Sequence, residues 1–182
     1  MPPARHDGTV ATRLLLISDT HVPARARRLP DDVWRAIDEA DVVVHAGDWV
    51  DVATLDAIEA RAARLVGVAG NNDGPELHAR LGEFARFEAG GVRFGVVHET
   101  GAAGGREARM DAAYSGPDAS DGIDVLVFGH SHIPWDTTTP RGIRLLNPGS
   151  PTDRRRQPVC SMMAALADAG ELREVTLVPV TR

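Results

Sequence analysis

The chain has 182 residues, of which 43% are hydrophobic, and it carries a formal net charge of -6. This length is enough for one domain with a sizeable core, and the charge disfavours general binding of nucleic acid, which needs many cations against the phosphates. All 20 basic residues are arginine, so a P-loop, Schiff-base chemistry and a lysine general base are excluded as well.

The sequence gives no sign of a membrane or secreted protein. Residues 1–12 are rich in Pro, Gly and Arg and lack the apolar core of a signal peptide, so we expect a flexible tail before a single domain over residues 13–182. No apolar run approaches the roughly 18 residues of a membrane span. The single cysteine, Cys160, excludes an internal disulfide and is expected to be a small buried hydrophobe. We therefore predict a cytoplasmic protein that does not contact a membrane.

Three apolar runs in the first half of the chain predict buried strands, and a polar cluster follows each one. The runs are residues 13–18, 42–44 and 65–68. They are continuous rather than alternating, which is typical of strands covered on both faces. The polar clusters are Ser18-Asp19-Thr20-His21, Gly47-Asp48 and Gly70-Asn71-Asn72-Asp73. The third cluster is also an ordinary turn composition.

Two helices are predicted between these strands. Val33, Trp34 and Ile37 form an apolar stripe after Pro30, and we expect Trp34 to lie in the core. Asp51 is expected to cap a second helix whose apolar face begins at residue 52. Within the second strand, a hydrogen-bonded structural role is expected for His45 rather than a ligand role.

The second half of the chain favours hairpins. Residues 84–97 read as an antiparallel pair that ends at His98, and a short helix is expected near residues 106–114, inside a Gly-rich stretch (101–122) that is alternatively a mobile flap. Residues 124–127 predict a buried strand, followed by Gly129-His130-Ser131-His132. In an extended segment both imidazoles can face one metal ion, although His-x-His alone is more often a surface turn. The remaining predicted strands are 134–139 with 143–146, and 159–166 with 172–180.

Seven side chains with oxygen or imidazole nitrogen atoms lie at or just after predicted strand ends. They are Asp19, His21, Asp48, Asn71, His98, His130 and His132. Functional groups collect beyond the carboxyl ends of strands in α/β sheets, so we expect one shared site. The set contains no thiolate, which suits Mn²⁺, Fe²⁺, Zn²⁺ or Ni²⁺. Seven ligands are too many for one tetrahedral ion and suit two ions that share a carboxylate.

The order Asp-x-His, Gly-Asp, Gly-Asn-x-Asp, His and Gly-His-x-His resembles the calcineurin-like metallophosphoesterase superfamily, and the short chain resembles its small prokaryotic phosphodiesterase branch. The resemblance covers roughly residues 14–150 and includes the turn Asn147-Pro148-Gly149-Ser150. It implies an α/β fold of two packed mixed β-sheets flanked by helices, a four-layer α/β/β/α sandwich.

The resemblance also implies roles for the seven side chains. Asp19, His21 and His132 would hold one divalent metal ion, Asn71, His98 and His130 the other, and Asp48 would bridge both. Mn²⁺ is the expected metal, with Ni²⁺, Fe²⁺ or Zn²⁺ as alternatives. A hydroxide between the ions would attack phosphorus in line, which makes Asp48 and Asn71 catalytic. Asn71 could also donate its amide N–H to a phosphate oxygen.

Three features depart from the family pattern or extend it. Asn72 stands where relatives carry a histidine or cysteine, and it cannot protonate a leaving group. Glu99 follows His98 where glycine is usual, so it could crowd the pocket. Arg154-Arg155-Arg156 follows the Asn-Pro-Gly-Ser turn as a solvated loop or as a clamp on a diester. We take Asn72, Arg154 and Arg155 as the candidate substrate-binding residues.

The sequence thus predicts a metal-dependent phosphoesterase, more a phosphodiesterase than a monoesterase, with a small phosphodiester or nucleotide-like substrate. The alternative is a non-catalytic scaffold of the same fold that binds protein partners, because the branch includes a catalytically silent trafficking subunit. All seven ligand positions hold competent residue types, which favours the enzyme. Trp49 and Trp135, beside two of the motifs, are expected to pack, with pocket walls or partner contacts as alternatives. The oligomeric state is left open, a homo-oligomer included.

Overall fold

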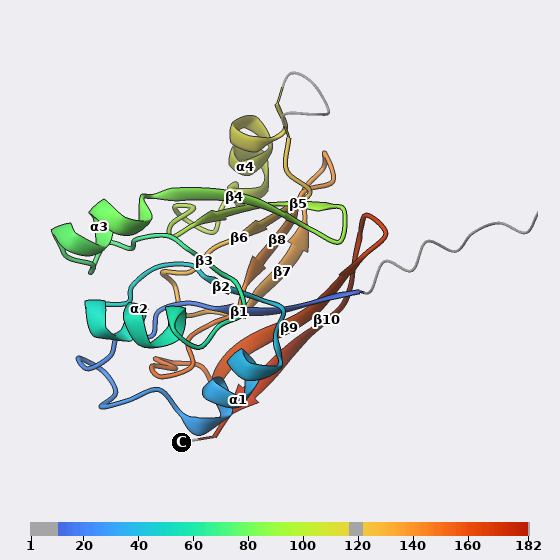
Figure 1. The fold of residues 1–182 in the computed structure, drawn as a ribbon. Helices are drawn as coiled ribbons and strands as arrows, with labels where there is room; N and C mark the ends of the chain where they lie inside the picture. The colour runs from blue at the N-terminus through green and yellow to red at the C-terminus, as the bar shows by residue number, and fades with distance from the viewer. Residues whose placement is uncertain (1–10, 117–121, 182) are drawn as a thin grey trace, which may run out of the picture.

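The computed structural model of the protein describes residues 11–116 and 122–181 (Figure 1). Most of the expected tail lies outside these residues, and the first strand already begins at Thr12. Residues 117–121 of the expected flap also lie outside the described part of the chain. Among the described residues, no helix combines the length and apolar character needed to cross a bilayer.

The strands form two five-stranded mixed sheets. Sheet A contains β1 (Thr12–Ile17), β2 (Val42–His45), β3 (Leu65–Gly67), β9 (Cys160–Asp168) and β10 (Glu171–Val180), in the order β10-β9-β1-β2-β3. Sheet B contains β4 (Phe84–Ala89), β5 (Val92–Val97), β6 (Val125–Val127), β7 (Trp135–Thr138) and β8 (Arg144–Asn147), in the order β4-β5-β6-β8-β7. Each sheet has three parallel neighbours, β1-β2-β3 and β5-β6-β8, with antiparallel strands beside them.

The helices cover the outer faces of the two sheets. They are α1 (Asp31–Glu39), α2 (Val52–Glu59), α3 (Pro75–Leu81) and α4 (Arg106–Tyr114). Figure 1 shows α1 and α2 on the side of sheet A and α4 on the far side, above sheet B. Met110 of α4 packs against Leu126 and Leu145 of sheet B. The expected four-layer α/β/β/α sandwich is therefore confirmed.

Strand β1 shows why its apolar run is continuous. Leu14 and Leu16 pack between the two sheets, whereas Leu15 and Ile17 pack against the helices on the other face. All four side chains are at most 3% exposed, and burial of one such side chain stabilises the fold by about 1.5–3 kcal/mol. β1 lies between β2 and β9, so the strand that carries the first site residues is central in its sheet.

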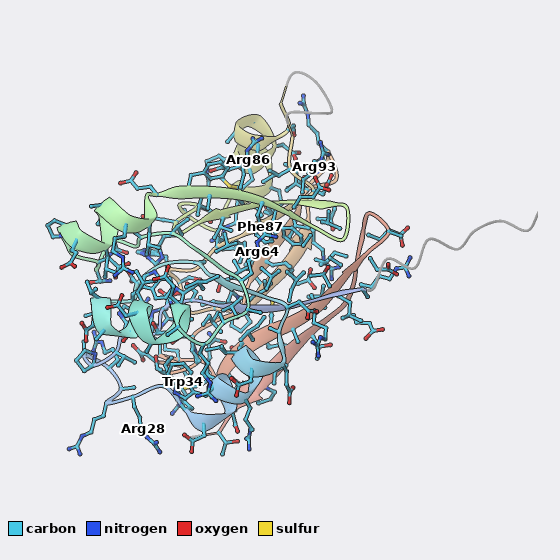
Figure 2. The ribbon with its side chains drawn as sticks, in the orientation of Figure 1. Arg28, Trp34, Arg64, Arg86, Phe87 and Arg93 are labelled. Atoms are coloured by element: carbon cyan, nitrogen blue, oxygen red, sulfur yellow. The ribbon has the colours of Figure 1, made fainter. Side chains whose placement is uncertain are left out.

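The predicted helices are largely confirmed. The helix α1 follows Pro30, and Asp51 caps α2 by accepting a hydrogen bond from Ala53 N at 3.1 Å. The expectation that Trp34 lies in the core is only half right, because it is partly buried, with the guanidinium of Arg61 5.2 Å from its ring (Figure 2).

Helix α3 was not predicted. It has seven residues and only one buried side chain, Leu77, so its sequence shows almost no apolar periodicity.

The final hairpin is confirmed, and Cys160 lies buried in β9 as expected. At the edges of the two sheets, Arg64 before β3 lies over Phe87 of β4, 5.4 Å from the ring (Figure 2).

Candidate metal centre

The seven predicted side chains come together in loops at the carboxyl ends of β1, β2, β3, β5 and β6. They form two clusters. The first contains Asp19, His21 and His132, all buried. Asp19 Oδ1 lies 3.3 Å from His132 Nε2 and 3.8 Å from His21 Nε2, and the two imidazole nitrogens are 3.2 Å apart. These three side chains therefore point their ligand atoms at one small volume.

The second cluster contains Asn71, His98 and His130. Asn71 Oδ1 lies 2.9 Å from both His98 Nε2 and His130 Nδ1, which are 3.3 Å from one another. His98 is therefore a full member of the cluster despite the glutamate that follows it. An amide oxygen and two imidazole nitrogens are ligands that borderline divalent ions accept.

Asp48 lies between the clusters. Its Oδ2 is 3.5 Å from His21 Nε2 and 3.4 Å from His98 Nε2, so one carboxylate oxygen faces both groups. Burial favours a higher pKa for Asp48, but its interaction with His98 and the hydrogen bonds from Asn72 outweigh burial and hold the pKa below its usual range. An ionised carboxylate therefore lies between the two clusters.

Asp19 shows most directly that the clusters suit a cation. Its Oδ2 accepts hydrogen bonds from Ser18 Oγ at 2.7 Å and His130 N at 3.0 Å. Its Oδ1 is buried without a hydrogen-bond partner and faces the two imidazoles of the first cluster. A buried carboxylate oxygen left without a partner is costly, and a metal ion supplies that partner.

His98 and His132 are each oriented by a backbone carbonyl, so that the lone pair of Nε2 faces its cluster. His98 Nδ1 lies 2.8 Å from Ala46 O, and His132 Nδ1 lies 2.6 Å from Asp153 O. A carbonyl only accepts, so Nδ1 carries the proton in each ring and Nε2 is free to bind a metal. Burial lowers the pKa of His21, which favours the neutral imidazole that metals bind.

The backbone around the site is left-handed at five of the seven residues. They are Asp19, His21, Asp48, His130 and His132, with φ between 43° and 67°. Each such non-glycine residue costs about 1–2 kcal/mol. The general argument that an extended His-x-His can aim both rings at one ion therefore does not apply here. The segment is a turn, in which Ser131 N donates to Gly129 O, and its two histidines join different clusters.

Close approach of the loops requires glycine at two positions. A Cβ on Gly129 would lie 1.9 Å from Ser18 Oγ and 2.7 Å from Asp19 Oδ2. A Cβ on Gly70 would lie 2.3 Å from Asp48 Oδ1. The loops after β6 and β3 can therefore reach the carboxylates only because these residues have no side chain.

Asp73 is a supporting residue for which no role was predicted. Its carboxylate accepts hydrogen bonds from Asp48 N at 3.0 Å, Val50 N at 2.6 Å and Gly70 N at 2.7 Å. It thus ties the loop after β2 to the loop after β3. The available signal was its place in the Gly-Asn-x-Asp string, which also fits an ordinary turn.

The turn at residues 147–150 supports the site from the other end of the chain. Asn147 Nδ2 donates to Gly129 O at 2.8 Å, and Ser150 Oγ donates to Asp19 O at 2.7 Å. Thr152 Oγ1 donates to Thr20 O, also at 2.7 Å. This turn and Thr152 therefore hold the loop that carries Asp19 and His21 and the loop that carries His130 and His132.

His45 and Trp49 are structural, as expected. Gly47 N donates to His45 Nδ1, so Nε2 carries the proton and donates to Thr20 Oγ1 at 3.0 Å. Burial holds the pKa of His45 well below its usual value, and the ring stays neutral. Trp49 is fully buried and stacks on His45 with ring centroids 3.5 Å apart, so it is not a pocket wall.

Glu99 does not crowd His98. Its side chain is 56% exposed, and its Oε1 lies 3.9 Å from His130 Nε2, the outer nitrogen of that ring.

The three candidate substrate-binding residues lie in different surroundings. Asn72 Nδ2 donates to Asp48 Oδ2 at 2.7 Å. The exposed Arg154 donates to Gln157 O, within its own loop, whereas Arg155 Nη1 lies 3.3 Å from His130 O, beside the site.

Two hollows border the clusters, and Glu99 lines both. One, of about 280 Å³, includes Asn71 and His98 in its lining. The other, of about 380 Å³, includes His130, Arg106 and Trp135. Asn71, His98 and His130, which form the second cluster, therefore line hollows that small molecules can enter.

Comparison with known proteins identifies the family. Residues 13–170 match the calcineurin-like phosphoesterase superfamily domain. The chain belongs to this superfamily. It is 34% identical over 165 residues to a probable metallophosphoesterase of Methanocaldococcus jannaschii. The matched region covers 91% of this chain and 80% of the relative.

Solved structures agree with this assignment. A Thermotoga maritima protein, TM1076, superposes with a TM-score of 0.71 at 34% identity, covering 93% of this chain and 99% of that one. Vacuolar protein sorting 29 from Cryptosporidium parvum superposes with a TM-score of 0.72 at 18% identity, covering 94% and 99%, and shows the fold alone. Calcineurin-like phosphoesterases use divalent metals, and this member has the donors for them in the two clusters joined by Asp48.

Proposed function

We propose that this phosphoesterase is a two-metal phosphodiesterase that acts on a small phosphodiester or nucleotide-like substrate. The observation that carries the proposal is Asp48 between two ligand clusters, beside an Asp19 oxygen that lacks any other partner. Two bound divalent ions, with Mn²⁺ the first candidate, would supply an activated water for in-line attack and would neutralise charge on the phosphoryl oxygens.

The side chains of the site would have distinct roles. Asp19, His21 and His132 would hold one ion, Asn71, His98 and His130 the other, and Asp48 would contact both. Asn71 presents its Oδ1 to the two histidines, which leaves its Nδ2 group free to donate to a phosphoryl oxygen. Glu99 lies near the outer nitrogen of His130 and would orient that ring, as carboxylates behind metal-bound histidines do.

Two observations bear on the substrate: one favours a diester over a monoester, and the other concerns the leaving group. The two hollows that border the clusters offer separate room for the two organic arms of a diester. In addition, Asn72 is not an acid, and its amide is engaged by Asp48, so the leaving-group proton would come from solvent. Esters with good leaving groups should then react fastest. A steep dependence of rate on leaving-group pKa supports this, and a flat dependence, with chemistry rate-limiting, contradicts it.

The test uses metal-stripped protein with Mn²⁺, Ni²⁺, Zn²⁺ or Mg²⁺ restored singly, and bis(p-nitrophenyl) phosphate beside p-nitrophenyl phosphate. The variant Asp48→Asn should lower metal-restored diester hydrolysis by more than about 100-fold, because even outer-shell changes cost 10–100-fold. Asp51→Asn, at the start of α2, is the matched control. Folded protein that turns over neither ester with any metal would reject the proposal and favour the scaffold alternative.

A further inference from the structure

Arg106 is a buried cation beside the candidate metal centre. It is the first residue of α4 and is 5% exposed. Its guanidinium carbon lies 4.9 Å from the ring centroid of Phe128 and 4.5 Å from that of Trp135. Two aromatic rings therefore hold the guanidinium in place without neutralising its charge.

No carboxylate in the described residues forms an ion pair with Arg106. Its Nε is buried without a hydrogen-bond partner, and its Nη2 makes one long bond, 3.4 Å, to Gly101 O. Other half-buried arginines of the protein do have acidic partners, as Arg144 has in Asp136 at 2.8 Å. Glu107, the next residue, attracts Arg106 electrostatically but forms no ion pair with it. A buried charge is normally paired, so a ligand is a candidate for the missing partner.

The position of Arg106 indicates which kind of ligand would pair with it. Arg106 and His130 line the same hollow of about 380 Å³, so a molecule bound through the second cluster extends toward the guanidinium. The other walls include Trp135 and Ile133, the latter 46% exposed, which suit an apolar or aromatic body. Glu99, also in this lining, is an acid that repels anions, so a negative group in this hollow is expected beside the cation Arg106.

We propose that this hollow binds one arm of the substrate through a second anionic group, a phosphate or a carboxylate, held by Arg106. Guanidinium matches both groups with paired N–H donors. The inference rests on the proposed function only for the place of the reacting phosphoryl group. It defines the preferred substrate as a phosphodiester with an anionic arm, in contrast to a diester whose arms are neutral.

The experiment measures binding to the Mn²⁺-loaded protein by calorimetry, with two matched ligand pairs. Thymidine 3′,5′-bisphosphate is compared with thymidine 5′-monophosphate, and 4-phosphonobenzoate with phenylphosphonate. The member with the second anion should bind at least about tenfold more tightly in one or both pairs, and the pair that responds identifies the anion. Arg106→Met should abolish this preference, Arg106→Lys should retain part of it, and Arg35→Met, on α1, should keep it in full.

Two results would overturn the inference: equal affinities within both pairs for the unaltered protein, or a preference that survives in Arg106→Met. The first needs no variant, so it decides the matter even if a variant does not fold. Hydrolysis of bis(p-nitrophenyl) phosphate by the same preparations separates the two proposals. Binding preference without turnover rejects the phosphoesterase proposal alone, and turnover without preference rejects the Arg106 inference alone.

Discussion

Replacing Asp73 with asparagine would show how strongly the loops of the metal centre are held together. The carboxylate accepts three hydrogen bonds from backbone N–H groups, those of Asp48, Val50 and Gly70, and it is 9% exposed. Asparagine has the same shape, but only one of its terminal atoms accepts. At least one N–H would face an NH₂ group, and the other bonds would lose their charged acceptor. One bond lost at about 2 kcal/mol and two weakened by about 0.5 kcal/mol each give a destabilisation of about 3 kcal/mol.

Urea unfolding of the metal-free protein, followed by circular dichroism, measures this change. Asp51→Asn is the control, because Asp and Asn are equivalent helix caps and its free energy of unfolding should change by less than about 0.5 kcal/mol. The Asp73 variant should also bind Mn²⁺ at least about tenfold more weakly. An Asp73→Asn protein as stable as the control, with unchanged Mn²⁺ affinity, would refute the idea that this carboxylate positions the loops.

Three further predictions concern packing, metal and pH. Gly129→Ala should weaken Mn²⁺ binding at least about tenfold, because the added Cβ overlaps Ser18 and Asp19. The control Gly74→Ala, which has open space around it, should leave Mn²⁺ affinity unchanged. Equal Mn²⁺ affinities of the two variants in a titration would contradict the packing argument. Mn²⁺ at 100 times its Kd should raise the free energy of unfolding by about 2.7 kcal/mol per site, and a urea midpoint unmoved by chelator would count against a metal site. The lowered pKa of His45 means that its contribution to the stability of the metal-free protein is complete above pH ~6.5 and declines as the pH falls below that value. His45→Gln should flatten this pH dependence between roughly pH 7.5 and 5.5, and identical slopes in both proteins would show that another group is responsible.

The elements that the sequence predicts well are those whose burial is visible locally. Leu14 to Ile17 alternate between two apolar layers, so all four had to be hydrophobic, and a strand follows from the run itself. Helix α3 could not be predicted in this way, because it buries only Leu77 and begins immediately after a turn.

The sequence was enough to predict which side chains of the candidate site come together, but not the contacts that support them. Carboxylate, amide and imidazole groups at strand ends can be read from the chain. The hydrogen bond of Asp73 to Asp48 N spans 25 residues, and that of His130 N to Asp19 spans 111. Such contacts, and the left-handed turns they hold, depend on how distant loops meet. For the same reason, nothing in the local sequence distinguishes Arg106 from the other arginines of the chain.

The hydrogen bond from Ser150 to Asp19 joins residues 131 positions apart, and β1 pairs on one side with β9. During synthesis, the candidate metal ligands Asp19 and His21 therefore leave the ribosome long before the turn and the strand that fix them. Until then β1 has an open edge, because only β2 is available to pair with it. The loop that carries Asp19 and His21 is thus fixed only after residues 147–168 have been made, so a chain that ends before them lacks these supports of the candidate metal centre.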